Sequence, residues 1–136
     1  MDALASVDDS ATLEELTQRL EQSTLWKGKR VRGLRLFDRE DRRLLQAVSR
    51  GEFAIHGLRN RDLQALLFGA PAASVTEARR RSAWVSRKLR LLRAHHLLQK
   101  VPHTHRYHVT KAGRRIITAI LTAARATVAQ LTALAA

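Results

Sequence analysis

Residues 74–110, SVTEARRRSAWVSRKLRLLRAHHLLQKVPHTHRYHVT, decide how this chain folds. Ser74 and Glu77 form an S-x-x-E capping box, which predicts that a long helix begins here and runs to about residue 95. The spacing of apolar residues then changes from helical to alternating, so residues 97–109 predict a β-hairpin with a polar tip around Pro102. A long basic helix followed directly by a hairpin is therefore the centre of the predicted fold.

Positive charge is distributed unevenly along the chain. The 136 residues include 25 Lys and Arg against 12 Asp and Glu, which gives a formal net charge of +13. Residues 1–77 hold 12 of each sign, so the whole excess, 13 basic residues with no acidic one, lies in residues 78–136. Because a segment of one sign repels itself, we expect a polyanionic partner, and nucleic acid is the commonest.

The helix predicted over 75–95 has two unlike faces at 100° per residue. The face predicted to be buried carries Ala78, Val85, Leu89 and Leu92, and the opposite face carries Arg80, Ala83, Arg87, Arg90 and Ala94. Small alanines allow a helix to approach the major groove closely, and arginines can reach guanine edges or phosphates. An ordinary solvated face is the alternative, but such a face usually balances its arginines with glutamates one turn away.

The predicted DNA contacts lie on this helix and at the hairpin tip. They are Arg79, Arg80, Arg81, Ala83, Trp84, Ser86, Arg87 and Arg90 on the helix, and His103, Thr104, His105 and Arg106 at the tip. Trp84 has two open interpretations, since it could stack on the nucleic acid or pack over the preceding helix. The histidines of the hairpin have no carboxylate nearby to orient them, so we expect them to meet phosphates or the minor groove and predict no metal site.

The remaining elements are predicted from capping residues and short apolar runs. Helices are expected at 12–22, 38–50, 61–68 and from 110 to about 134, after the caps Thr12, Asp38, Asn60 and Thr110. Residues 53–55 predict a short strand. Residues 23–35 predict a linker that carries an auxiliary basic arm, Lys27, Lys29, Arg30, Arg32 and Arg35. His96 occupies a helix end where glycine is usual, so we expect a left-handed backbone there.

The last predicted helix repeats apolar residues at alternating spacings of four and three. These positions, Ile117, Leu121, Ala124, Val128 and Leu131, form a candidate dimer seam. A homodimer would read two half-sites about 34–36 Å apart or a multiple of that distance. The alternative is that the same residues bury against other helices of the same chain.

The order of the predicted elements resembles the winged helix-turn-helix DNA-binding domain. Residues 60–69 resemble its positioning helix, residues 82–92 its recognition helix, and RYHVTKAGR at 106–114 the closing wing strand of bacterial winged-helix regulators. The resemblance implies a mainly α fold with a small β-hairpin wing, flanked by an N-terminal helix and a long C-terminal helix. We expect an N-terminal helix with a basic arm or linker at 1–35, a winged-helix DNA-binding domain at 36–115, and a C-terminal helix at 116–136 that continues from the domain and could form a dimer.

No arrangement of residues indicates catalysis. The chain lacks a glycine-rich phosphate loop, and Asp41 and Asp62 are interpreted as helix N-terminal charges, so we expect no enzyme and no cofactor. The chain has no cysteine and no apolar run of about 18 residues, so neither disulfides nor membrane insertion is expected.

Three functions follow as hypotheses. The first is a duplex-DNA-binding transcription regulator of the cytoplasm, associated with the nucleoid, with the effector and target site undefined. The second is a DNA-binding accessory domain of a mobile-element or genome-maintenance system. The third is an RNA-binding adaptor, which the aromatic content of 4% disfavours because single-strand binders stack bases on aromatic rings.

Overall fold

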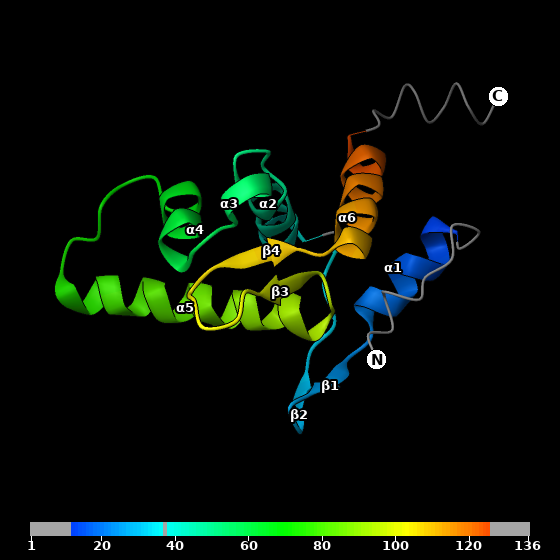
Figure 1. Ribbon diagram of the computed structural model, residues 1–136, viewed down its shortest axis with the longest axis horizontal. Helices are drawn as coiled ribbons and strands as arrows, with labels where there is room; N and C mark the ends of the chain where they lie inside the picture. Colours follow the sequence, from blue (N-terminus) through cyan, green and yellow to red (C-terminus); the bar gives the residue numbers. More distant parts are fainter. Residues whose placement is uncertain (1–11, 37, 126–136) are drawn as a thin grey trace.

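The computed structural model of this chain describes residues 12–36 and 38–125, and this part is mainly helical with two small antiparallel hairpins (Figure 1). The elements are α1 Leu13–Glu21, β1 Thr24–Trp26, β2 Lys29–Val31, α2 Arg39–Val48, α3 Phe53–His56, α4 Asn60–Leu67, α5 Val75–Ala94, β3 Leu98–Lys100, β4 Tyr107–Val109 and α6 Lys111–Ala124. The prediction of a mainly helical chain with a small hairpin is confirmed.

Helix α5 begins and ends where its sequence predicts. The Ser74 side chain accepts a hydrogen bond from the Glu77 N–H at 3.1 Å, and the Glu77 carboxylate accepts one from the Ala73 N–H at 2.7 Å. These bonds satisfy amide donors that a helix start leaves unpaired. At the other end His96 has a φ of 61°, which confirms the left-handed backbone expected at this position.

The two faces of α5 largely follow the prediction. Val85, Leu89 and Leu92 are buried in the core, as predicted. Ala78 was expected to be buried but is exposed, because the first turns of α5 extend beyond α4 (Figure 1). Ala94 was expected to be exposed but is buried, because β1 packs against the C-terminal end of the helix. The accessible part of the arginine face therefore ends before the last turn of α5.

A single hydrophobic core joins residues from all three predicted segments. Helix α5 packs against α4 and β3, α2 packs against α4 and α6, and α1 packs against α6. Leu20 and Leu34 from the N-terminal segment share the core with Leu45 and Leu63 of the central segment and with Ile117. The N-terminal residues thus help to hold the platform that supports α5.

We predicted a linker at residues 23–35, but the structure shows an antiparallel hairpin there. Strands β1 and β2 pair with Trp26 opposite Lys29, which leaves a two-residue turn. Lys27 and Gly28 in that turn have φ values of 50° and 78°. Positive φ at both central positions is typical of a type I′ turn, which fits the twist of a hairpin. We missed this turn because lysine, unlike asparagine or aspartate, gives no signal for the first of its positions.

The strand predicted at 53–55 is also wrong, because these residues form the short helix α3. Strand-like pairing occurs instead at Leu58, whose N–H and C=O both bond to Tyr107 at 2.8 Å. Gly57 precedes it with a φ of 73°, and a Cβ at this position would lie 2.6 Å from the Tyr107 oxygen. An apolar run of three residues has too little periodicity to separate a helix from a strand.

The candidate dimer seam does not form an exposed stripe in the structure. Ile117 and Leu121 are 1% and 5% exposed and belong to the core of their own chain, so the intramolecular alternative describes them. Ala124 is exposed at the end of α6. Val128 and Leu131 lie outside the described residues.

Candidate nucleic-acid interface

The exposed face of α5 carries a stripe of arginines around one small residue. Arg79, Arg80, Arg87 and Arg90 are exposed, as is Ala83 between them. Within the described residues the guanidinium groups of Arg79, Arg87 and Arg90 have no hydrogen-bond or ion-pair partner. We refer to Arg79, Arg80, Ala83, Arg87 and Arg90 as the α5 stripe.

Two predicted contact residues on α5, Arg81 and Trp84, also make contacts within the fold. Arg81 donates to the Ala70 carbonyl at 2.6 Å and pairs with Glu77 at 3.0 Å, so it holds the loop between α4 and α5. The Ala73 N–H and the Arg81 charge together keep the pKa of Glu77 below its ordinary value. Trp84 packs edge-on against Phe68, with ring centroids 5.7 Å apart. Packing over the preceding helix is therefore observed for Trp84, and the ring remains partly exposed.

Ser86 ties the exposed face of α5 to the start of α4. Its hydroxyl oxygen accepts a hydrogen bond from the Asn60 side chain at 3.0 Å, and the same amide group donates to the Ser82 carbonyl at 3.0 Å. We predicted Asn60 as the N-cap of α4, but the N-cap is Arg59, whose N–H donates to Asp62 at 2.7 Å. Asn60 thus fixes the angle between the two helices.

Two of the four predicted contact residues of the β3–β4 loop are exposed. His103 and His105 are exposed. Thr104 donates to the Val101 carbonyl at 2.9 Å, and Arg106 donates to the His56 carbonyl at 3.0 Å. These two bonds shape the loop and fix it to α3.

The residues of the predicted auxiliary basic arm differ in exposure and pairing. Lys27, Lys29, Arg30 and Arg35 are exposed, but Arg32 is only partly exposed and pairs with Asp41. Two guanidinium nitrogens of Arg32 donate to the two Asp41 oxygens at 2.8 and 3.0 Å. Asp41 is therefore an anchor for the hairpin as well as a charge in the first turn of α2.

The contact that sequence reasoning missed is made by Arg93. Its guanidinium lies over the Trp26 ring at 4.8 Å and over the Tyr107 ring at 5.9 Å. Cation–π contacts of this kind contribute roughly 0.5–2 kcal/mol each. Arg93 thus links both hairpins to α5, and nothing in its sequence neighbourhood distinguishes it from the other arginines of that helix.

His95 connects the end of α5 to the N-terminal hairpin. Its side chain is buried, and Nε2 lies 2.8 Å from the Arg32 carbonyl oxygen, to which the neutral ring donates. Burial lowers the pKa of His95 below its ordinary value, the hydrogen bond to Arg32 raises it by less, and the nearby charges of His96 and Arg32 lower it further. The folded protein therefore favours the neutral form of the His95 ring.

We expect the stability of the protein to fall as the pH drops below about 6.5, the ordinary histidine pKa. Below that value the unfolded chain takes up a proton at His95 that the folded chain binds less readily, so acid favours unfolding. Urea denaturation of H95Q between about pH 5 and 7.5 should show a flatter dependence than the unsubstituted chain. H103Q, a matched change at an exposed histidine, controls for the loss of an imidazole, and an unchanged slope in H95Q would contradict the assignment.

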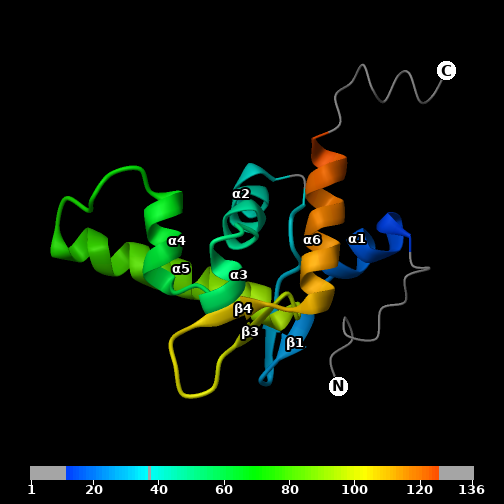
Figure 2. The ribbon, with the colours of Figure 1, turned by 45° about the horizontal axis from the view of Figure 1, so that its top comes forward.

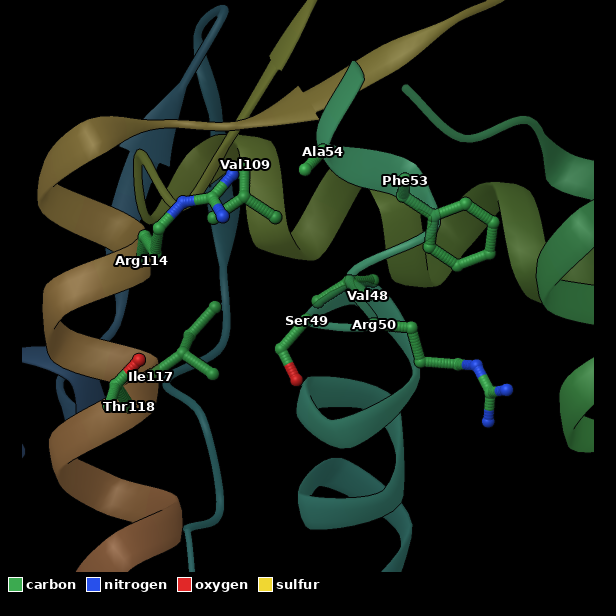
Figure 3. A pocket seen from close by; sticks show the side chains of 9 residues that line it. All are labelled: Val48, Ser49, Arg50, Phe53, Ala54, Val109, Arg114, Ile117 and Thr118. Atoms are coloured by element: carbon green, nitrogen blue, oxygen red, sulfur yellow. The ribbon is translucent and has the colours of Figure 1, made fainter. Parts of the chain in front are cut away.

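A separate hollow of about 160 Å³ lies between α2, α3, β4 and α6. Its floor includes Val48 and Ile117, and Figure 3 shows Arg114 reaching from α6 toward Val109 while Arg50 points away from α6. This volume lies below the roughly 300–1,000 Å³ of sites for drug-sized ligands.

Other classes of site receive no support from the described residues. In residues 12–36 and 38–125 no group of three or more His, Asp or Glu side chains is placed to hold a metal ion. No helix in the same part of the chain is long and apolar enough to cross a bilayer. No protein family, curated protein or solved structure matches the chain. The case for a function therefore rests on the geometry and charge of the α5 stripe and the hairpins.

Proposed function

We propose that this chain is a winged-helix protein that binds duplex DNA, with α5 in the major groove and the β3–β4 loop on the backbone or in the minor groove. The observation that carries the proposal is the α5 stripe, in which Arg79, Arg87 and Arg90 have no partner among the described residues. Three uncompensated guanidiniums beside the small Ala83 side chain suit the bases and phosphates of a major groove.

The arrangement around α5 supports the winged-helix part of the proposal. Helix α4 is joined to α5 through Asn60, and the β3–β4 hairpin follows α5 directly. The pairing of Leu58 with Tyr107 adds a third extended segment beside β4. The loop from 68 to 74 is longer than a tight helix-turn-helix connection, but Arg81 holds it against the start of α5.

The choice of duplex over single strands follows from the aromatic residues. Trp26, Phe68, Trp84 and Tyr107 are each partly buried and engaged with a ring or a cation of the same chain. Proteins that bind single strands usually stack bases on accessible rings. Regulation of transcription is the role we propose, and an accessory DNA-binding domain of a mobile element would use the same surface.

A salt titration of binding tests the proposal. We expect the chain to bind pooled genomic duplex more tightly than single-stranded RNA of matched length. The slope of log K against log salt should be roughly −4 to −7, because each neutralised phosphate contributes about 0.9. Equal or tighter binding to RNA would support the adaptor hypothesis instead, and no binding to either would show that the basic surface has a different partner.

A further inference from the structure

A second hollow, of about 300 Å³, lies between the N-terminal hairpin and α5. Arg30 borders it from β2, and Arg87 and Arg90 border it from α5. The uncharged part of its lining is formed by Val31, Trp84 and Leu91. The sequence places Arg30 more than fifty residues from the two helix arginines, so only the fold brings these three arginines to one space. We call this space the hairpin hollow.

Some of the charged residues around the hairpin hollow are paired with an acid and others are not. Arg32 and Lys88, which also border it, pair with Asp41 and Glu40 respectively. The Arg30 guanidinium, by contrast, donates to the neutral Ser23 hydroxyl at 2.9 Å and to no other group in the described part of the chain. Arg87 and Arg90 have no partner among the described residues. Three arginines that have no acidic partner among the described residues thus border one space, an arrangement that an anion stabilises.

The hairpin that supplies Arg30 is fixed in place before any ligand binds. The Arg32–Asp41 pair anchors the chain just after β2, and the His95 ring bonds to the Arg32 carbonyl. The Leu34 N–H donates to the Leu20 carbonyl at 2.8 Å, which joins the same segment to α1. A preformed site of this kind loses little conformational entropy on binding.

The α5 stripe lies between the N-terminal hairpin on one side and α4 on the other, and both hairpins contact Arg93 beyond its end. On one side, β2 borders the hairpin hollow together with Arg87. On the other side, Asn60 of α4 bonds to Ser86, and β4 lies beside Arg93 through Tyr107. In Figure 2 both hairpins project from the same side of the molecule. A strand that follows one edge of a groove occupied by α5 would pass the hairpin hollow.

We propose that the hairpin hollow binds a phosphate group of a DNA strand, held by Arg30 together with Arg87 and Arg90, so that the N-terminal hairpin acts as a second wing. The planar guanidinium matches phosphate oxygens in pairs, and the apolar lining around Trp84 suits the face of a deoxyribose. This assignment rests on the proposed duplex binding. It adds a backbone contact to the base contact proposed for Arg87, so replacing Arg87 should weaken binding as well as reduce discrimination.

The test compares R30Q with R19Q, which removes the same charge from an exposed side chain on α1. Both variants should keep the thermal unfolding midpoint of the unsubstituted chain, because both side chains are exposed. On a duplex selected with the unsubstituted chain, R30Q should weaken binding by about tenfold and lower the salt slope by about 1, and R19Q should change neither appreciably. Single methylphosphonate substitutions in the duplex then locate the phosphate. At one flanking position the substitution should weaken binding by the unsubstituted chain but not binding by R30Q.

The second-wing proposal and the duplex-binding proposal are contradicted by different results. If the unsubstituted chain binds duplex but R30Q matches R19Q in affinity and slope, the second wing is wrong and duplex binding stands. If the unsubstituted chain binds no duplex, both proposals fail. Thymidine 5′-monophosphate tests binding of a free nucleotide, with Trp84 fluorescence measured in W26F. If the nucleotide quenches this fluorescence saturably, and R30Q abolishes the quenching without changing duplex affinity, the hollow binds a free nucleotide. That result would overturn the strand contact.

Discussion

Replacing Arg87 with alanine is expected to reduce the discrimination between a cognate and a random duplex by about 1–3 kcal/mol, or roughly 5- to 150-fold. Arg87 is exposed near the middle of α5, one turn from Ala83, where the helix could approach the groove most closely. A side chain at this position that reads a guanine edge stabilises only the correct sequence, whereas one that merely adds positive charge stabilises every sequence.

The matched control for Arg87 is Lys111→Ala, which removes one exposed positive charge at the start of α6. This change should weaken binding to cognate and random duplex about equally. Affinities of both variants for both duplexes, measured at one fixed salt concentration, give the comparison. If the two variants alter the ratio of affinities by the same factor, α5 is not the element that reads sequence.

Asp41→Ala is expected to lower the free energy of unfolding by about 3 kcal/mol, the lower end of the range for breaking a buried ion pair. The buried carboxylate accepts two bonds from Arg32 and a third from the Arg35 N–H at 2.8 Å. Its removal leaves these donors without an acceptor. The lower end applies because the Arg32 side chain is 36% exposed and can be partly hydrated.

Chemical denaturation of Asp41→Ala at neutral pH measures this loss, and Glu52→Ala is the control. Glu52 pairs with Arg50, but both side chains are more than half exposed, so its replacement should cost less than about 1 kcal/mol. Equal losses in the two variants would contradict the anchoring role of Asp41.

Acid should weaken the same anchor. Burial raises the pKa of Asp41, but the bonds from Arg32 and the Arg35 N–H outweigh burial and bring the pKa below its ordinary value. The stabilisation is therefore complete above about pH 4 and is lost as the pH falls through the lower, folded pKa. Asp41→Ala should lack this contribution, so its stability should differ from that of the unsubstituted chain less in strong acid than at neutral pH.

The sequence was most informative where one local signal was enough. Ser74 and Glu77 located the start of α5, and the apolar spacing of Val85, Leu89 and Leu92 identified its buried face, because caps and periodicity act within a few residues. The left-handed backbone of His96 could be predicted because this residue occupies a helix end where glycine is usual. The β3–β4 hairpin followed from the change of period after α5.

The sequence was least informative where distant residues determine the outcome. Arg32 and Asp41 both carry charges that suit an exposed surface, and only the fold shows that they form a pair beneath the hairpin. The sequence does not distinguish Arg81 from Arg79 and Arg80, yet Arg81 donates a hydrogen bond to the Ala70 carbonyl and is not part of the α5 stripe. The division of arginines into free and engaged groups is a tertiary property that no single-residue pattern reports.

The position of Arg93 between the Trp26 and Tyr107 rings has a consequence for how a duplex would be accommodated. Because one guanidinium on α5 contacts both hairpins, neither hairpin can swing outward without giving up a cation–π contact. The spacing between the hairpins is thus set by the protein, and a duplex bound as proposed would have to adjust its own curvature and groove width. Flexible pyrimidine–purine steps make such adjustment easier, so selection among sites would depend on DNA deformability as well as on base edges.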